Sequence, residues 1–247
     1  MPRLAFAILA FLAACSHTRQ REAVDALARS VPVSAFEEGS FGNVLPYRLL
    51  RPAEVRAGEL YPLVVIFHGS GAIGTNNVDQ LGPFAKSWAT PAMRARHPAF
   101  VLVPHFATRS AVYTPEGSHP TDSLRNALRG IDELQRTLPI DPHRIYAAGF
   151  SMGGSAVWNA IALRPGLFSA AVIVAGVPNR DALAVLGQTR LLLIHGDADT
   201  ENPYAAARAA YEAAPKDRVA FWRYRGLGHE FPLELITSTK LADWLFR

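Results

Sequence analysis

The sequence is poor in cysteine and has no long apolar run. Cys15 is the only cysteine among 247 residues, which excludes an intrachain disulfide and a metal site built from several thiolates. No apolar run reaches the roughly 18 residues that a membrane-spanning helix needs. Glycine and proline, at 18 each, exclude a collagen-like or low-complexity chain. With 49% hydrophobic and 19% charged residues, the chain can bury a substantial core.

Basic residues exceed acidic ones by 25 to 21, but they form no binding pattern. Only Lys86, Lys216 and Lys240 are lysines, and the arginines are scattered rather than interleaved with aromatic residues. We therefore predict a solvated basic surface and no nucleic-acid partner. The sequence also has no G-x-G-x-x-G motif, Walker motif or cluster of metal ligands, so it implies no cofactor and no metal.

The N-terminus has the pattern of a targeting segment. Arg3 precedes an apolar stretch over residues 4–14, which is followed directly by Cys15. This pattern resembles the bacterial lipoprotein signal, which implies a signal peptide over residues 1–14, lipidation at Cys15 and a polar tether over residues 15–32. The resemblance predicts an anchor in the bacterial cell envelope, facing the periplasm from the outer membrane because Ser16 replaces an inner-membrane Asp. A signal peptide without lipid, and a core helix with an incidental cysteine, remain alternatives.

Residues 33–247 read as a single domain in which strands and helices alternate. Apolar runs ending near glycine or proline predict strands at 60–69, 99–104, 144–149, 169–176, 190–196 and 219–226, after an early strand within 41–52. Helical spacing of apolar residues predicts helices at 122–138, 155–164, 203–214 and 233–246. The alternation predicts an α/β fold with a mainly parallel sheet and helices on both faces.

A G-x-S-x-G pentapeptide lies between a predicted strand and a predicted helix. A sharp turn there would expose the Ser151 hydroxyl, and Gly149 and Gly153 would remove side chains where strand and helix nearly collide. The backbone N–H of Met152 would then lie at a helix N-terminus. The alternative is a glycine-rich turn with an incidental serine.

A serine nucleophile needs a base, and an acid to hold that base. His229 follows a strand and precedes the last helix, so it is the candidate base; His195 lies within a strand end and is expected to pack. Asp199 is preferred as the acid because it lies further past the strand end than Asp197, which is expected to bond local backbone; Glu201 is a third choice.

The segment 68–71 follows a strand and can supply oxyanion donors. The N–H of Ser70, or less favourably Gly71, can pair with that of Met152 to stabilise a developing oxyanion. His68 lies on the strand itself and is expected to bond its own loop.

Together these residues resemble the α/β-hydrolase superfamily, and within it the polyhydroxybutyrate depolymerases, feruloyl esterases and prolyl-oligopeptidase-like predicted peptidases. The matching segments are residues 61–77, 140–158, 194–203 and 226–232. The resemblance implies a catalytic triad of Ser151, Asp199 and His229, with Ser70 and Met152 as oxyanion donors. One departure is Asn202, where the family often has valine.

Loops around the predicted site suggest an open pocket without a large cap domain. Only residues 177–189 separate two strands where many lipases carry a cap. The longest irregular stretch, 105–120, offers Arg109 and Tyr113 as candidate wall residues. Gly71 and Asn77, beside the oxyanion loop, are further candidate substrate contacts, although Asn77 could instead cap a helix.

The sequence thus predicts a serine hydrolase that cleaves carboxylic esters, small or oligomeric, through an acyl-enzyme intermediate. A peptidase of the prolyl-oligopeptidase type and a non-catalytic, lipid-anchored binding protein are the alternatives. The sequence does not determine the oligomeric state.

Overall fold

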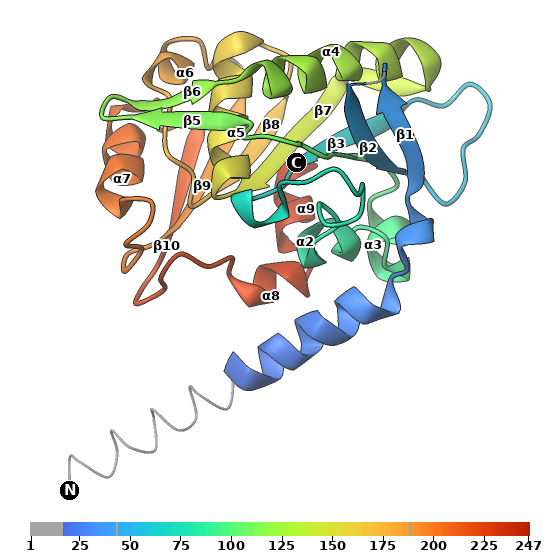
Figure 1. Cartoon of the computed structure of the whole chain (residues 1–247), viewed down its shortest axis with the longest axis horizontal. Coiled ribbons are helices and arrows are strands. Elements are labelled where there is room, and N and C mark those ends of the chain that lie inside the picture. Colours follow the sequence, from blue (N-terminus) through green and yellow to red (C-terminus); the bar gives the residue numbers. More distant parts are fainter. Residues whose placement is uncertain (1–16, 43, 188) are drawn as a thin grey trace, which may run out of the picture.

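One eight-stranded sheet organises the chain (Figure 1). The computed structural model describes residues 17–42, 44–187 and 189–247, so the predicted signal peptide and Cys15 lie outside it. Strands follow the order β1-β2-β4-β3-β7-β8-β9-β10, and those from β4 to β10 run parallel. Their bounds are β1 Glu37–Phe41, β2 Leu45–Leu50, β3 Tyr61–Phe67, β4 Phe100–Pro104, β7 Ile140–Phe150, β8 Ala170–Val174, β9 Arg190–Gly196 and β10 Val219–Tyr224.

Helices cover both faces of this sheet and divide the core in two (Figure 1). The core on one face includes residues of α4 Asp122–Thr137, α5 Met152–Leu163, α6 Arg180–Ala184 and α7 Tyr204–Ala213. The core on the other face includes residues of α2 Pro83–Ser87, α3 Pro91–Arg96, α8 Leu233–Ile236 and α9 Lys240–Leu245. The predicted α/β architecture is confirmed.

Alternation along the central strands explains why their sequences are continuously apolar. In β3, Leu63, Val65 and Phe67 join one core, whereas Val64 and Ile66 join the other. Successive side chains of a strand point to opposite faces, so a strand covered by helices on both sides needs apolar residues at every position. The sheet is therefore a rigid base from which the loops at its carboxyl edge project.

Three segments differ from the sequence-based expectation. The early strand became a hairpin of β1 and β2, and the stretch 105–120 holds a separate hairpin of β5 Ala111–Thr114 and β6 Gly117–Pro120. The last helix is broken into α8 and α9. There Thr239 donates its hydroxyl to Asp243 at 2.8 Å, and such local side-chain bonds compete with a continuous helix.

The tether region is partly helical. Residues 17–30 form a helix that projects from the domain (Figure 1). Its C-terminal half contacts the domain, where Lys86 Nζ donates to the Ala28 carbonyl at 2.8 Å and Val24 is buried. In the described part of the chain, no helix has the length and apolar character needed to cross a bilayer.

The connection between β8 and β9 is short, as predicted. Its described residues contain only α6, a helix of five residues, so no large cap is inserted there. At the carboxyl edge of the sheet lie instead the β5–β6 hairpin and the loops that carry the predicted triad.

Candidate active site

The predicted nucleophile lies on a strained turn between β7 and α5. Ser151 has φ 56° and ψ −120°, a left-handed conformation that costs a non-glycine residue free energy. A Cβ on Gly149 would lie 2.2 Å from the Gly153 carbonyl oxygen, and one on Gly153 would lie 2.0 Å from the Phe67 carbonyl oxygen. Strand and helix can therefore meet only because both positions are glycine, and this close approach gives the turn its sharpness.

Three predicted residues from separate loops meet at this turn. His229 Nε2 lies 2.7 Å from Ser151 Oγ, and His229 Nδ1 lies 2.8 Å from Asp199 Oδ2. With Nδ1–H donating to the carboxylate, the Nε2 lone pair is free to accept the serine proton. The geometry is that of a nucleophile, a general base and an orienting acid in one chain of hydrogen bonds.

The acid is held by backbone as well as by the imidazole. The N–H groups of Glu201 and Asn202 each donate to Asp199 Oδ1 at 2.9 Å. Burial raises the pKa of Asp199, but hydrogen bonds from His229 and these N–H groups outweigh it and leave the pKa below its ordinary value. The carboxylate is therefore ionised when it faces the imidazole.

Asp197 lies two residues away but is committed elsewhere. Its carboxylate accepts from Arg223 Nε and from the Gly226 N–H, each at 2.7 Å. These contacts connect the end of β9 to β10 and the loop after it. Asp197 therefore has a structural role, but its partners are 26 and 29 residues away and are not the local backbone that the sequence suggested.

His195 has a role that the sequence did not reveal. It was expected only to pack, and it is buried at 2% exposure, but its Nε2 lies 3.1 Å from Asp199 Oδ2 and 3.0 Å from the Asn202 carbonyl. Both neighbours are acceptors, so Nε2 carries a proton and donates to Asp199 Oδ2, the same carboxylate oxygen that His229 Nδ1 contacts. The spacing of His195 four residues before Asp199 was the one feature of the sequence that could have indicated this contact.

Replacing His195 by Phe should therefore lower kcat for ester hydrolysis by about tenfold, the cost of losing a buried bond to a charged group. KM should change little, because the ring does not reach the nucleophile. His195→Gln, whose amide can donate in place of Nε2, should recover most of the rate and the wild-type pH profile. Equal losses in kcat for Phe and Gln, with both variants folded, would show that the ring is needed only for packing.

The candidate oxyanion donors, Ser70 and Met152, lie on two segments that approach Ser151. Ser70 opens the 3-10 turn η2 Ser70–Ala72, and a Cβ on Gly69 would lie 3.8 Å from Ser151 Cβ. Neither the Ser70 nor the Met152 N–H donates to another described residue. Gly71 is exposed in the same turn. Two unpaired N–H groups beside a nucleophile are suited to an oxyanion.

Two buried histidines hold this loop. His68 donates from Nδ1 to the Gly69 carbonyl at 2.8 Å and accepts the Phe106 N–H at 3.0 Å. His105 accepts the Asn77 N–H at 2.9 Å and lies 3.0 Å from the Ala72 carbonyl. Each ring must be neutral to accept one backbone proton while donating another. The structural role expected of His68 therefore agrees with these contacts.

The stability of the protein should fall in mild acid because of His68. Burial lowers its pKa from 6.5 to about 4, so between these values the unfolded chain binds a proton that the folded chain excludes. The free energy of unfolding should drop by roughly 3 kcal/mol as the pH falls from about 6.5 to about 4. Urea denaturation across that range should show a shallower pH dependence for His68→Asn than for the wild type. Identical slopes for the two folded proteins would contradict this assignment.

The candidate substrate contacts divide into two groups. The prediction that Asn77 contacts substrate is wrong. Asn77 is buried at 4% exposure, and its side-chain amide donates to the Tyr47 carbonyl and accepts from Gln80. Its side chain is thus used by the fold. Tyr113, by contrast, lines a pocket, and the Arg109 guanidinium lies 5.7 Å from its ring centroid.

No group of three or more His, Cys, Asp or Glu side chains in the described residues is placed to hold a metal ion.

Comparisons with known proteins find similarity to esterases. No protein-family model matches the chain. NocK, a candidate esterase of Nocardia uniformis subsp. tsuyamanensis, is 27% identical over 205 residues, covering 82% of this chain and 56% of NocK. A thermostable esterase of known structure superposes with a TM-score of 0.78 at 28% identity, covering 87% of this chain and 63% of that protein.

A third similar protein has low sequence identity to this chain, so its similarity shows a shared fold and nothing more. Est2, an esterase of Thermogutta terrifontis, superposes with a TM-score of 0.63 at 19% identity, covering 86% of this chain and 91% of that protein. The chain spans less than two thirds of the length of NocK and of the thermostable esterase.

Proposed function

We propose that this chain, whose fold is that of the α/β-hydrolases, is a serine hydrolase that cleaves carboxylic esters. The observation that carries the proposal is the continuous chain of hydrogen bonds from Ser151 through His229 to Asp199, starting on a strained turn. Ester hydrolysis is the reaction preferred because both NocK and the thermostable esterase carry that description.

The reaction proceeds in two halves. His229 Nε2 takes the proton of Ser151 as Oγ forms a bond to the ester carbonyl carbon, and the carbonyl electron pair moves to oxygen. The N–H groups of Ser70 and Met152 stabilise that oxyanion, while Asp199 stabilises the imidazolium. The oxyanion then collapses, the bond to the alcohol oxygen breaks, and His229 protonates the alcohol as it leaves.

Water completes the cycle on the acyl-serine. His229, again neutral, removes a proton from a water molecule, which attacks the acyl carbon and forms a second oxyanion at the same N–H groups. Its collapse releases the carboxylic acid and returns the proton to Ser151.

A panel of esters tests the proposal directly. Acetyl, butyryl, octanoyl and feruloyl esters should be hydrolysed, and a fluorophosphonate probe should label the protein stoichiometrically at Ser151. Matched amides, tested alongside, should be turned over far more slowly; faster amide cleavage would favour the peptidase alternative. Failure of the folded protein to react with the probe would favour a binding protein without catalysis.

We also propose that the domain is held at a bacterial membrane, facing the periplasm from the outer membrane, by lipid on Cys15. The support is the apolar segment that ends directly before the chain's single cysteine. Two acyl chains would bury many methylene groups, each stabilising the anchored state by about 0.8 kcal/mol.

Cys15→Ser should accordingly abolish fatty-acid incorporation and move the protein from the membrane fraction to the soluble fraction. Metabolic labelling with a fatty-acid analogue measures this, and Ser16→Ala serves as a neighbouring control that should label normally. Labelling of the Cys15→Ser protein at the wild-type level would refute the lipid anchor and leave the hydrolase proposal unaffected.

A further inference from the structure

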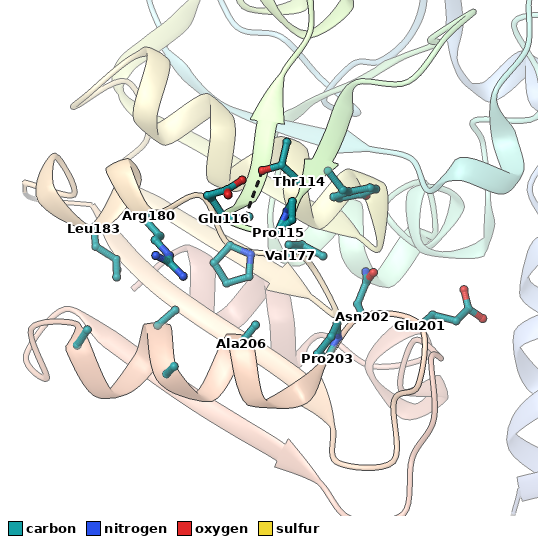
Figure 2. A pocket seen from close by; sticks show the side chains of 16 residues that line it. Thr114, Pro115, Glu116, Val177, Arg180, Leu183, Glu201, Asn202, Pro203 and Ala206 are labelled. Carbon is teal, nitrogen blue, oxygen red and sulfur yellow. Dashed lines mark hydrogen bonds between the residues drawn. The ribbon is translucent and has the colours of Figure 1, made fainter.

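A pocket of about 770 Å³ lies next to the loop that follows Asp199, and Figure 2 shows the side chains that line it. The β5–β6 hairpin, residues 177–178, the start of α6, the loop after Asp199 and helix α7 form its walls. Figure 2 shows Glu201 and Asn202 at one end of the pocket and Arg180 and Leu183 at the other. This volume lies within the range of about 300–1,000 Å³ that is common for small-molecule sites.

Direct contacts connect this pocket to the reacting groups. Glu201, at the end of the pocket, has its Oε2 3.8 Å from His229 Nε2. Asn202, which also lines it, donates its backbone N–H to Asp199 and its side-chain amide to the Ala175 carbonyl, at the end of the strand beside β7. A group attached to an ester at Ser151 therefore has a short path into this pocket.

Small side chains on α7 create the volume. Its pocket-facing residues are all alanine, namely Ala206, Ala209, Ala210 and Ala213. Proline, valine and leucine supply much of the remaining wall, including Pro178, Val177 and Leu183. An alanine face opposite a hairpin leaves an apolar space that the protein itself does not fill, and apolar ligand groups gain free energy by entering such a space.

A second, smaller cavity lies on the oxyanion side of Ser151. It has a volume of about 180 Å³ and is lined by His68, Gly69, Phe150 and Phe231. The Phe150 ring centroid lies 5.0 Å from that of His229, so this cavity also borders the reacting groups. It has room for a short group only.

We infer that the preferred substrates are esters with one bulky apolar group, aromatic or branched, and one short group. The bulky group occupies the alanine-walled pocket, and the short group occupies the phenylalanine-lined cavity. The inference rests on the proposed serine hydrolase function and extends it to a substrate class. It makes Ala206 of α7, which Figure 2 shows at the pocket wall, a specificity-determining position.

Two isomeric esters test this inference. Methyl 2-naphthylacetate has a bulky acyl group and a short alcohol, whereas 2-naphthylmethyl acetate has the reverse, and ethyl butyrate has two short groups. Ala206→Phe should lower kcat/KM for at least one naphthyl isomer by about tenfold or more, as expected when a pocket is filled. Activity on ethyl butyrate should change by less than about twofold. The isomer that loses activity identifies whether the acyl or the alcohol part enters the pocket.

Ala205→Phe is the matched control, because Ala205 is exposed on the same helix and does not line the pocket. It should leave all three rates near wild type. Unchanged rates for both naphthyl isomers in Ala206→Phe would overturn the inference. So would equal losses on all three esters in a variant with a wild-type melting temperature.

Binding separates this inference from the hydrolase proposal. In a Ser151→Ala background the naphthyl esters should bind without turnover, and adding Ala206→Phe should weaken their calorimetric Kd by about tenfold. If that binding depends on Ala206 but the wild-type protein hydrolyses none of the esters, the pocket is retained and the hydrolase proposal is rejected. Ester hydrolysis with no dependence on Ala206 would retain the hydrolase and reject the pocket.

Discussion

Ser151→Ala is expected to lower kcat for ester hydrolysis by roughly 10⁴–10⁶-fold, the largest effect of any single substitution in this chain. The hydroxyl is the group that forms the acyl intermediate, and only binding and oxyanion stabilisation remain without it. Alanine keeps Cβ and the backbone N–H that donates to the Val174 carbonyl at 2.9 Å, so the turn should persist. Steady-state kinetics with a butyryl ester measures the loss.

Ser155→Ala is a suitable control for that experiment. Its hydroxyl lies one turn into α5, donates to the Ser151 carbonyl at 3.2 Å and accepts the Val177 N–H at 2.9 Å. The control should lose stability but keep most of its turnover and its labelling by a fluorophosphonate. A folded Ser151→Ala protein that retained wild-type turnover would reject the serine mechanism.

The fold was predictable because its central strands carry an unambiguous signal. Strands β3, β4 and β8 are apolar at nearly every position, and β9 is apolar from Leu191 to Ile194, as two-sided burial requires. The elbow was predictable for a related reason: no residue larger than glycine fits at Gly149 or Gly153. Steric necessity in these segments is local, so the sequence displays it.

The pocket walls were not predictable because they depend on distant contacts. The β5–β6 hairpin is short and lacks a regular apolar pattern, and its position depends on Ser118 donating to the Val177 carbonyl at 2.8 Å. Asn159 of α5 donates to the same hydroxyl at 3.0 Å. These partners are 59 and 41 residues away from Ser118, and no local pattern indicates such pairings.

Polar residues near the site were the hardest to interpret from sequence. The sequence suggested Asn77 as a substrate contact, but its amide donates a hydrogen bond to the Tyr47 carbonyl, 30 residues away. His195 looked like packing, but its N–H reaches the acid. A buried polar side chain must satisfy its hydrogen bonds, and which partners do so is decided by the tertiary fold.

Asp199→Asn is expected to lower kcat by about 10⁴-fold, whereas Asp197→Asn should lower it by less than about tenfold. The asparagine amide would face His229 Nδ1 with either a neutral oxygen or an N–H, so the imidazolium loses its counter-charge and the ring can adopt the wrong tautomer. Asp197 instead accepts from Arg223 and Gly226 and touches neither Ser151 nor His229.

The two variants form a matched pair, since each replaces one carboxylate in the same loop by its isosteric amide. Each carboxylate accepts two or more hydrogen bonds, so thermal unfolding of both should be compared with the wild type before the rates are interpreted. A kcat loss that tracks Asp199 alone, at similar melting temperatures, assigns the acid by chemistry rather than by stability. A larger kcat loss for Asp197→Asn would reverse the assignment, and the role of His195 as a donor to the acid would then fail with it.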